Sequence, residues 1–275
     1  MNEYKPENEN NTINLNPIDY SSTSTKEKPV KSQQEKMVTA NYAKVFIWFG
    51  IGLLITGVIA FGLPNIFWFA SNENIDNYII AYYVMMAVAF VGIFPLSIMM
   101  SISTTFRNNK AFIKVTYILY TIFMGILVSG IMLTILALTD VYDISFINVV
   151  ASAFLITAGL FVIMGLIGVF TKKINKAVPI LITLVVGALI LSLVNFFLQV
   201  DWITWVVDFV LFIWILLVTA IDMHNVSKIA QRVDFKEESN LAIYLAYTLY
   251  VDFVYMFIRV VYYVLILYSR SSKNK

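Results

Sequence analysis

The chain has 275 residues, of which 60% are hydrophobic and 13% charged, and its mean hydropathy is +0.79. A soluble domain is about half apolar and about a quarter charged, so the composition excludes an ordinary soluble protein and indicates a polytopic membrane protein. The formal net charge of +2 gives no sign of nucleic-acid binding, the absence of cysteine excludes disulfides and thiolate sites, and the single histidine, His224, argues against a histidine-rich metal site.

Residues 1–40 differ in composition from the rest of the chain. They are rich in Asn, Ser, Lys and Glu and contain few large apolar residues. Such a segment buries too little apolar surface to offset the entropy lost on ordering, so a disordered tail is predicted. It does not have the pattern of a signal peptide. Residues 41–270 are expected to form a single membrane domain.

Seven apolar stretches follow the tail. Each has the roughly 20 residues that a helix needs to cross about 30 Å of hydrocarbon. Backbone groups in lipid must be paired internally, which favours helices. The sequence therefore predicts an all-α membrane protein with seven transmembrane helices. The stretches are residues 45–69, 78–103, 112–138, 146–170, 178–199, 203–222 and 242–268.

The connectors between these stretches alternate in charge. Three contain no lysine or arginine and three are basic, so the positive-inside rule places the basic connectors and the N-terminus in the cytoplasm. The basic C-terminal residues 269–275 would then lie outside if the last stretch crosses fully, and a re-entrant last segment is the alternative. Its length favours a full crossing. The connectors without lysine or arginine are 71–77, 139–145 and 199–202, and the basic ones are 106–114, 171–176 and 225–232.

The last apolar stretch carries a polar stripe. Thr248, Asp252, Tyr255, Arg259 and Tyr262 are three or four residues apart and so share one helical face. Such a stripe cannot face lipid, so this helix is expected inside the bundle with the stripe turned inward. Asp252 and Arg259 are separated by roughly 10 Å along the helix axis and do not pair directly. Arg259 either joins the interior or snorkels toward the outer interface.

The sixth stretch carries aspartates on one side. Asp201, Asp208 and Asp222 fall within about 40° of one another around the helix axis. We expect Asp201 to be solvated, Asp208 to face outer water or a polar neighbour, and Asp222 to lie at the cytoplasmic helix end. His224 is expected in the loop that follows.

Asp222 and Asp252 form a candidate site if the two helices bring them together. Two carboxylates in a low-dielectric site cannot both ionise easily and would share a proton. Their carboxylate oxygens would also be suitable ligands for Ca²⁺. The sequence indicates no firm metal site. Whether the two residues are close cannot be read from the sequence, and a structural role remains open for each.

Several segments occur in a characteristic order between residues 45 and 268. They are "VTYILYTIFMGILVSG", "AFLITAGLFVIMGLIGVFTKKINK", "SLVNFFLQ", "TAIDMHNVSKIAQ" and "NLAIYLAYTLYVDFVYMF". Together they resemble the Bax inhibitor-1 family, also called the transmembrane Bax inhibitor motif proteins, in its bacterial form. The resemblance implies a seven-helix fold with a central C-terminal helix, a multi-pass protein of the bacterial plasma membrane, and a pH-sensitive Ca²⁺ leak. It assigns the proton-sensing pair to Asp222 and Asp252.

Some positions depart from the family pattern. Arg107 lies near the family's latching arginine but not in strict register with it. Met124 stands before Gly125 where the family often has an acid, and Arg259 comes earlier than the family's arginine on the last helix. The candidates for a latch or an ion path are Arg107, Arg259 and Asp208.

Three classes of function are open. The first is a passive Ca²⁺ leak controlled by protons, with the lipid bilayer, Ca²⁺ and protons as partners and no cofactor. The second is an interaction protein that modulates a membrane protease or a stress or cell-death response without transport. An enzyme ranks last, because no common catalytic motif is present. Intramembrane aspartyl proteases also use two aspartates, but Asp222 is expected at a helix end.

Overall fold

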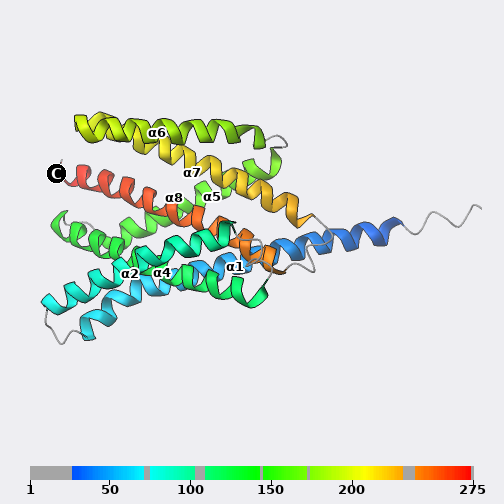
Figure 1. Cartoon of the computed structure of the whole chain (residues 1–275), viewed down its shortest axis with the longest axis horizontal. Helices are drawn as coiled ribbons and strands as arrows, with labels where there is room; N and C mark the ends of the chain where they lie inside the picture. Colours follow the sequence, from blue (N-terminus) through cyan, green and yellow to red (C-terminus); the bar gives the residue numbers. More distant parts are fainter. Residues whose placement is uncertain are drawn as a thin grey trace, which may run out of the picture. The chain divides into compact units, whose positions relative to one another are not determined.

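The computed structural model describes residues 27–70, 75–102, 109–142, 145–171, 174–231 and 239–273. Within these ranges it has seven helices that are long and apolar enough to cross a membrane, which confirms the predicted all-α fold. A short 3₁₀ helix, η2, connects two of them (Figure 1). The elements are α1 (Glu27–Ala70), α2 (Ile75–Ile102), α4 (Lys110–Tyr142), α5 (Phe146–Phe170), η2 (Ile174–Ala177), α6 (Val178–Leu198), α7 (Asp201–Ala230) and α8 (Ser239–Lys273).

The helix ends differ from the predicted ones at both ends of the chain. Helix α1 begins at Glu27, inside the predicted tail, and the predicted disorder of residues 1–26 lies outside the described residues. The chain divides by its internal contacts into residues 1–37 and 38–275. Helix α8 is continuous to Lys273, so it has the length that a full crossing requires.

The predicted connector at 225–232 is wrong, because α7 continues through it to Ala230. Val226 and Ala230 are fully buried, and the Asn41 side chain donates a 3.0 Å hydrogen bond to the Ala230 carbonyl oxygen. Burial of this apolar face extends the helix about two turns beyond the apolar stretch. Asp222 therefore lies inside α7 and not at its end.

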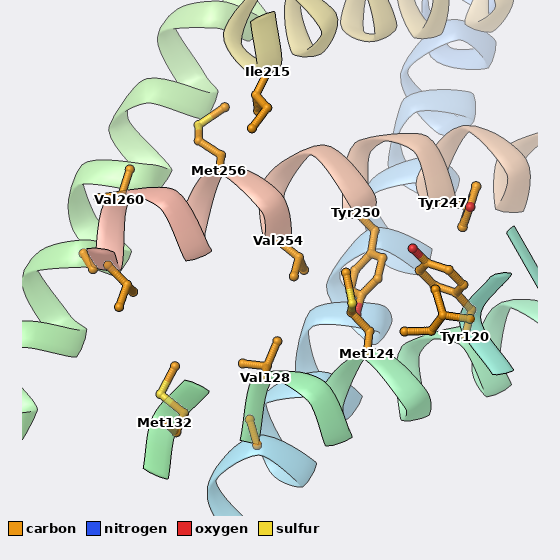
Figure 2. Close-up of a cluster of buried hydrophobic side chains, with 14 of the residues drawn as sticks. Tyr120, Met124, Val128, Met132, Ile215, Tyr247, Tyr250, Val254, Met256 and Val260 are labelled. Atoms are coloured by element: carbon orange, nitrogen blue, oxygen red, sulfur yellow. The ribbon is translucent and has the colours of Figure 1, made fainter. Parts of the chain in front are cut away.

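Helix α8 occupies the centre of the bundle, as expected. Half of the residues in its most apolar 18-residue stretch are buried, which is a larger share than in any other described span. It packs against α4, α5 and α7, while α6 packs against α7 (Figure 1). Figure 2 shows the two sides of α8, where Val254 points toward Val128 of α4 and Met256 points toward Ile215 of α7.

Tyrosines of α8 connect this helix to α4 and α1. The rings of Tyr120 and Tyr247 meet edge to face with centroids 4.9 Å apart (Figure 2). Tyr250 packs in the same way against Tyr117. The Tyr117 hydroxyl donates to the Trp48 carbonyl oxygen at 2.8 Å, and the Tyr250 hydroxyl bonds with that of Thr56. These buried hydroxyls thus find partners within the protein, which offsets the cost of placing them in apolar surroundings.

Two glycines let α7 approach α5 closely. A Cβ atom at Gly168 would lie 2.2 Å from the Ala220 carbonyl oxygen, and one at Gly165 would lie 3.0 Å from the end of the Met223 side chain. The backbone at Ala220 cannot move away without shifting α7. Gly168 therefore fixes how near the two helices lie.

We expect Gly168→Ala to destabilise the protein by about 1–3 kcal/mol, because the added methyl group overpacks the α5–α7 contact. Gly159→Ala is the matched control on the same helix, since a Cβ atom there meets nothing within 4 Å. It should stabilise the protein by up to about 1 kcal/mol through helix propensity. Denaturant unfolding in detergent micelles measures both values, and equal effects would contradict the close contact.

Candidate functional site

Helices α7 and α8 bring Asp222 and Asp252 together. Asp252 is 7% exposed and Asp222 is half-buried, and the two carboxyl groups are near enough for their charges to interact. The contacts are reciprocal, because Thr248 of α8 lies within hydrogen-bonding reach of Asp222 and Thr219 of α7 lies within reach of Asp252. Each helix thus contributes one threonine and one aspartate, about one turn apart.

The two threonine hydroxyls already donate within their own helices. Thr219 donates to the Ile215 carbonyl oxygen at 2.9 Å and Thr248 to the Leu245 carbonyl oxygen at 3.0 Å. A hydroxyl has a single proton to donate but can also accept a hydrogen bond. In this arrangement each threonine oxygen can accept a hydrogen bond from a protonated carboxyl group. The site can therefore accommodate a proton held between its acids.

An ionised Asp252 would be poorly compensated. Its Oδ2 atom is buried and makes no hydrogen bond to any described residue. A buried carboxylate without partners carries a large desolvation cost, which is reduced by a proton or by a cation. Within the described ranges, no group of three or more His, Cys, Asp or Glu side chains could hold a metal ion. Two carboxyl groups supply fewer oxygens than a resident Ca²⁺ site needs, so the pair suits an ion that keeps much of its water.

A second charged contact joins the same two helices. Nη1 of Arg259 donates to Oδ1 of Asp208 at 2.5 Å, and the side chains are 30% and 19% exposed. The threonine contacts set an antiparallel register in which Asp208 lies opposite residue 263, so Arg259 reaches about one turn along α8 to meet it. Asp208 thus has a polar neighbour, which is one of the alternatives expected for it, and Arg259 is paired within the protein while 30% exposed.

The polar stripe of α8 is only partly turned inward. Asp252 is buried, whereas Tyr255 and Tyr262 are 45% and 44% exposed, so the expectation is wrong for the two tyrosines. They line a crevice of about 560 Å³ between α7 and α8, together with Arg259 and Trp214. The crevice gives their hydroxyl groups open space beside the ion pair.

His224 is a buried residue of α7, and its predicted loop position is wrong because the helix continues past it. The side chain is 6% exposed, and its Nδ1 atom lies 3.0 Å from the Gly168 carbonyl oxygen. Its Nε2 atom has no hydrogen-bond partner in the described part of the chain. The apolar residues that follow at helical spacing, Val226 and Ala230, were the available signal.

The two remaining predicted residues are Asp201 and Arg107. Asp201 is exposed and is the first residue of α7, where a negative charge is favourable near the helix N-terminus. Arg107 lies outside the described residues, so its suggested role as a latch stays a prediction.

We expect Asp208 and Arg259 to be energetically coupled. Asp208→Ala and Arg259→Ala should each lower stability, while the double variant should lose less than the sum by about 1 kcal/mol or more, because either single change leaves an unpaired charge. Asp201→Ala, which removes an exposed acid of the same helix, is the control. Unfolding of all variants in micelles gives the coupling energy, and additive losses would show that the pair contributes nothing.

Comparison with known proteins identifies the family of the chain. Residues 38–270 match the family model described as "Inhibitor of apoptosis-promoting Bax1". The chain is 27% identical over 220 residues to the inner membrane protein YbhL of Escherichia coli (strain K12), which covers 78% of this chain and 87% of that protein. The same identity and coverage hold for YbhL of Escherichia coli O6:H1 (strain CFT073). The chain is thus an integral multi-pass membrane protein that belongs to the Bax inhibitor-1 family.

Proposed function

We propose that the protein is a passive Ca²⁺ leak channel of the bacterial plasma membrane, with a cytoplasmic N-terminus and with Asp222 and Asp252 as its proton sensor. The observation that carries the proposal is the reciprocal contact of Asp222 with Thr248 and of Asp252 with Thr219 across the α7–α8 interface. The family membership supports a membrane role, and the charge, burial and pairing of the aspartates support proton control.

Protonation would act by changing the contact between α7 and α8. With one proton between the acids, a carboxyl group can donate to a threonine oxygen and the helices are held together. Loss of that proton leaves two negative charges close together in a site of low dielectric, where their repulsion is strong. A helix pair with two packing arrangements converts this local change into a change in ion flow.

The second charged contact would keep the adjoining crevice passable for a cation. Arg259 alone would place a positive charge beside Tyr255 and Tyr262 and would repel Ca²⁺. Its pairing with Asp208 neutralises that charge locally. The Asp208–Arg259 pair therefore supports a cation path along the α7–α8 side of the protein.

The test is Ca²⁺ entry into proteoliposomes from about pH 6 to pH 8, compared between the wild type and variants that lack one carboxyl group of the pair. Wild-type flux should vary with pH, while Asp222→Asn and Asp252→Asn should each remove that variation, because neither retains two carboxyl groups. Asp201→Asn, which removes an exposed acid of α7, should behave as wild type.

Two results would contradict the proposal. The first is a folded wild-type protein that passes no Ca²⁺ at any pH. The second is an unchanged pH response in Asp252→Asn. Thermal unfolding of each variant separates loss of sensing from loss of fold.

A role as an interaction protein is the second candidate, and one observation favours it. The family match begins at residue 38, and residues 1–37 form a separate unit by their internal contacts. A segment outside the common domain can engage a partner, such as a membrane protease, without taking part in transport.

Removal of residues 1–37 separates the two candidates. The shortened chain should retain pH-dependent Ca²⁺ flux, because Asn41 and its hydrogen bond to Ala230 remain. If the tail docks a partner, turnover of membrane-protease substrates in cells should change while flux does not. Loss of flux on removal would instead make the tail part of the channel.

An enzymatic role receives less support from the site. Asp222 lies within α7, so a position at the helix end is no longer an argument against an intramembrane aspartyl protease. That hypothesis needs another test. The crevice beside Arg259 is not lined by Asp222 or Asp252, so it does not present a peptide bond to the pair. Incubation with a model transmembrane substrate should therefore yield no cleavage.

A further inference from the structure

An apolar groove of about 390 Å³ opens between α1 and α5 on the side of α8 away from α7. Gly57 and Phe61 of α1 form one edge, and Ile147 and Phe154 of α5 form the other. At these edges Phe61, Ile147 and Phe154 are 50%, 73% and 49% exposed. The floor is formed by α4 and α8, so the groove leads from the protein surface to the central helix.

The chemistry of the groove restricts what can fill it. Its single hydroxyl-bearing residue is Thr56, whose Oγ1 already donates to the Thr121 carbonyl oxygen at 3.2 Å and bonds with the Tyr250 hydroxyl. A polar ligand would find no free partner there, and water needs two to four. The volume is more than twice the about 150 Å³ of an apolar cavity that takes up benzene. The occupant must therefore be hydrocarbon.

The position of the groove identifies the source of that hydrocarbon. Its walls lie within four segments that are long and apolar enough to span the membrane, Met37–Ile66, Lys110–Thr139, Phe146–Phe170 and Asn240–Tyr268. The medium at the open edges is then the acyl-chain region of the bilayer. Toward the start of α1, the stacked rings of Phe49 and Phe161, with centroids 5.4 Å apart, join α1 to α5.

We propose that this groove is a binding site for an acyl chain of a membrane phospholipid, which enters between α1 and α5 and contacts α8. Phe154 lies at the entrance and packs against Phe253 and Phe257 of α8, with ring centroids 5.9 and 6.5 Å apart. Phe253 is the residue next to Asp252 in the chain. A chain in the groove therefore touches α8 directly beside the residue that faces α7.

Photolabelling tests the site with the full-length protein. The probe is a phosphatidylcholine with a photoreactive diazirine in one acyl chain, reconstituted with the protein, irradiated and mapped by mass spectrometry. Lipids around the protein label outward residues such as Leu155, which is 71% exposed. An acyl chain in the groove should also label Val254 of α8 and Met132 of α4, which are 3% and 4% exposed.

Filling the groove should remove the inner labels alone. Gly57→Phe projects into open space, because a Cβ atom there meets nothing within 4 Å, and Ala151→Phe fills the groove from α5. Both should lose the labels on α8 and α4 and keep the label on Leu155. Gly50→Phe is the control, since Gly50 is two turns away on the same face of α1, is equally open and does not line the groove.

Three results would overturn the proposal. Labels confined to outward residues in the wild type would show that the chain does not enter. Inner labels that persist in both groove-filling variants would show that they arise elsewhere. Crosslinks between two copies of the protein through the α1 and α5 edges would assign the groove to a protein contact instead of a lipid.

Discussion

Several polar groups of α8 find their partners inside the bundle, because hydrocarbon offers none. Tyr250 bonds to Thr56 of α1, Tyr247 reaches Ser97 of α2, and Arg259 pairs with Asp208 of α7. Each of these contacts connects the central helix to a different part of its surroundings. The fold is thus held at the centre by a small number of polar contacts set within extensive apolar packing.

The two sides of α8 differ in what they can change. Toward α1, α4 and α5 the helix packs with aromatic rings and aliphatic side chains, whose contacts do not depend on pH. Toward α7 it meets Asp222, Thr219 and Asp208, where charge and protonation determine the interaction. A change at the α7 face can therefore alter one interface of α8 while the opposite packing remains, which is the condition for a local switch.

The sequence predicts well those features that depend on a single helix. Apolar length predicts the seven spans, and helical spacing places Asp252 and Arg259 on one face of α8. The resemblance to the family predicts that Asp222 and Asp252 form the sensing pair. That role stays a prediction, although the structure brings the two side chains together.

Features that depend on contacts between helices could not be predicted in the same way. The pairing of Asp208 with Arg259 depends on the antiparallel register of α7 and α8. The spacing of residues within a single helix does not predict that register. The extension of α7 to Ala230 follows from its burial near Asn41, and the importance of Gly168 follows from the nearness of Ala220. Such contacts become visible only when the helices are packed together.

The most direct test of the account is crosslinking between α7 and α8 in intact membranes. The natural chain has no cysteine, so paired substitutions give a clean background. Asp222→Cys combined with Thr248→Cys should crosslink readily with an oxidant or a short dithiol reagent, whereas Asp201→Cys combined with Thr248→Cys should not. Efficient crosslinking confined to the first pair is the predicted result. Its absence, while Asp208→Cys with Tyr263→Cys does crosslink, would show that Asp222 does not meet α8 as described and would contradict the paired-aspartate site.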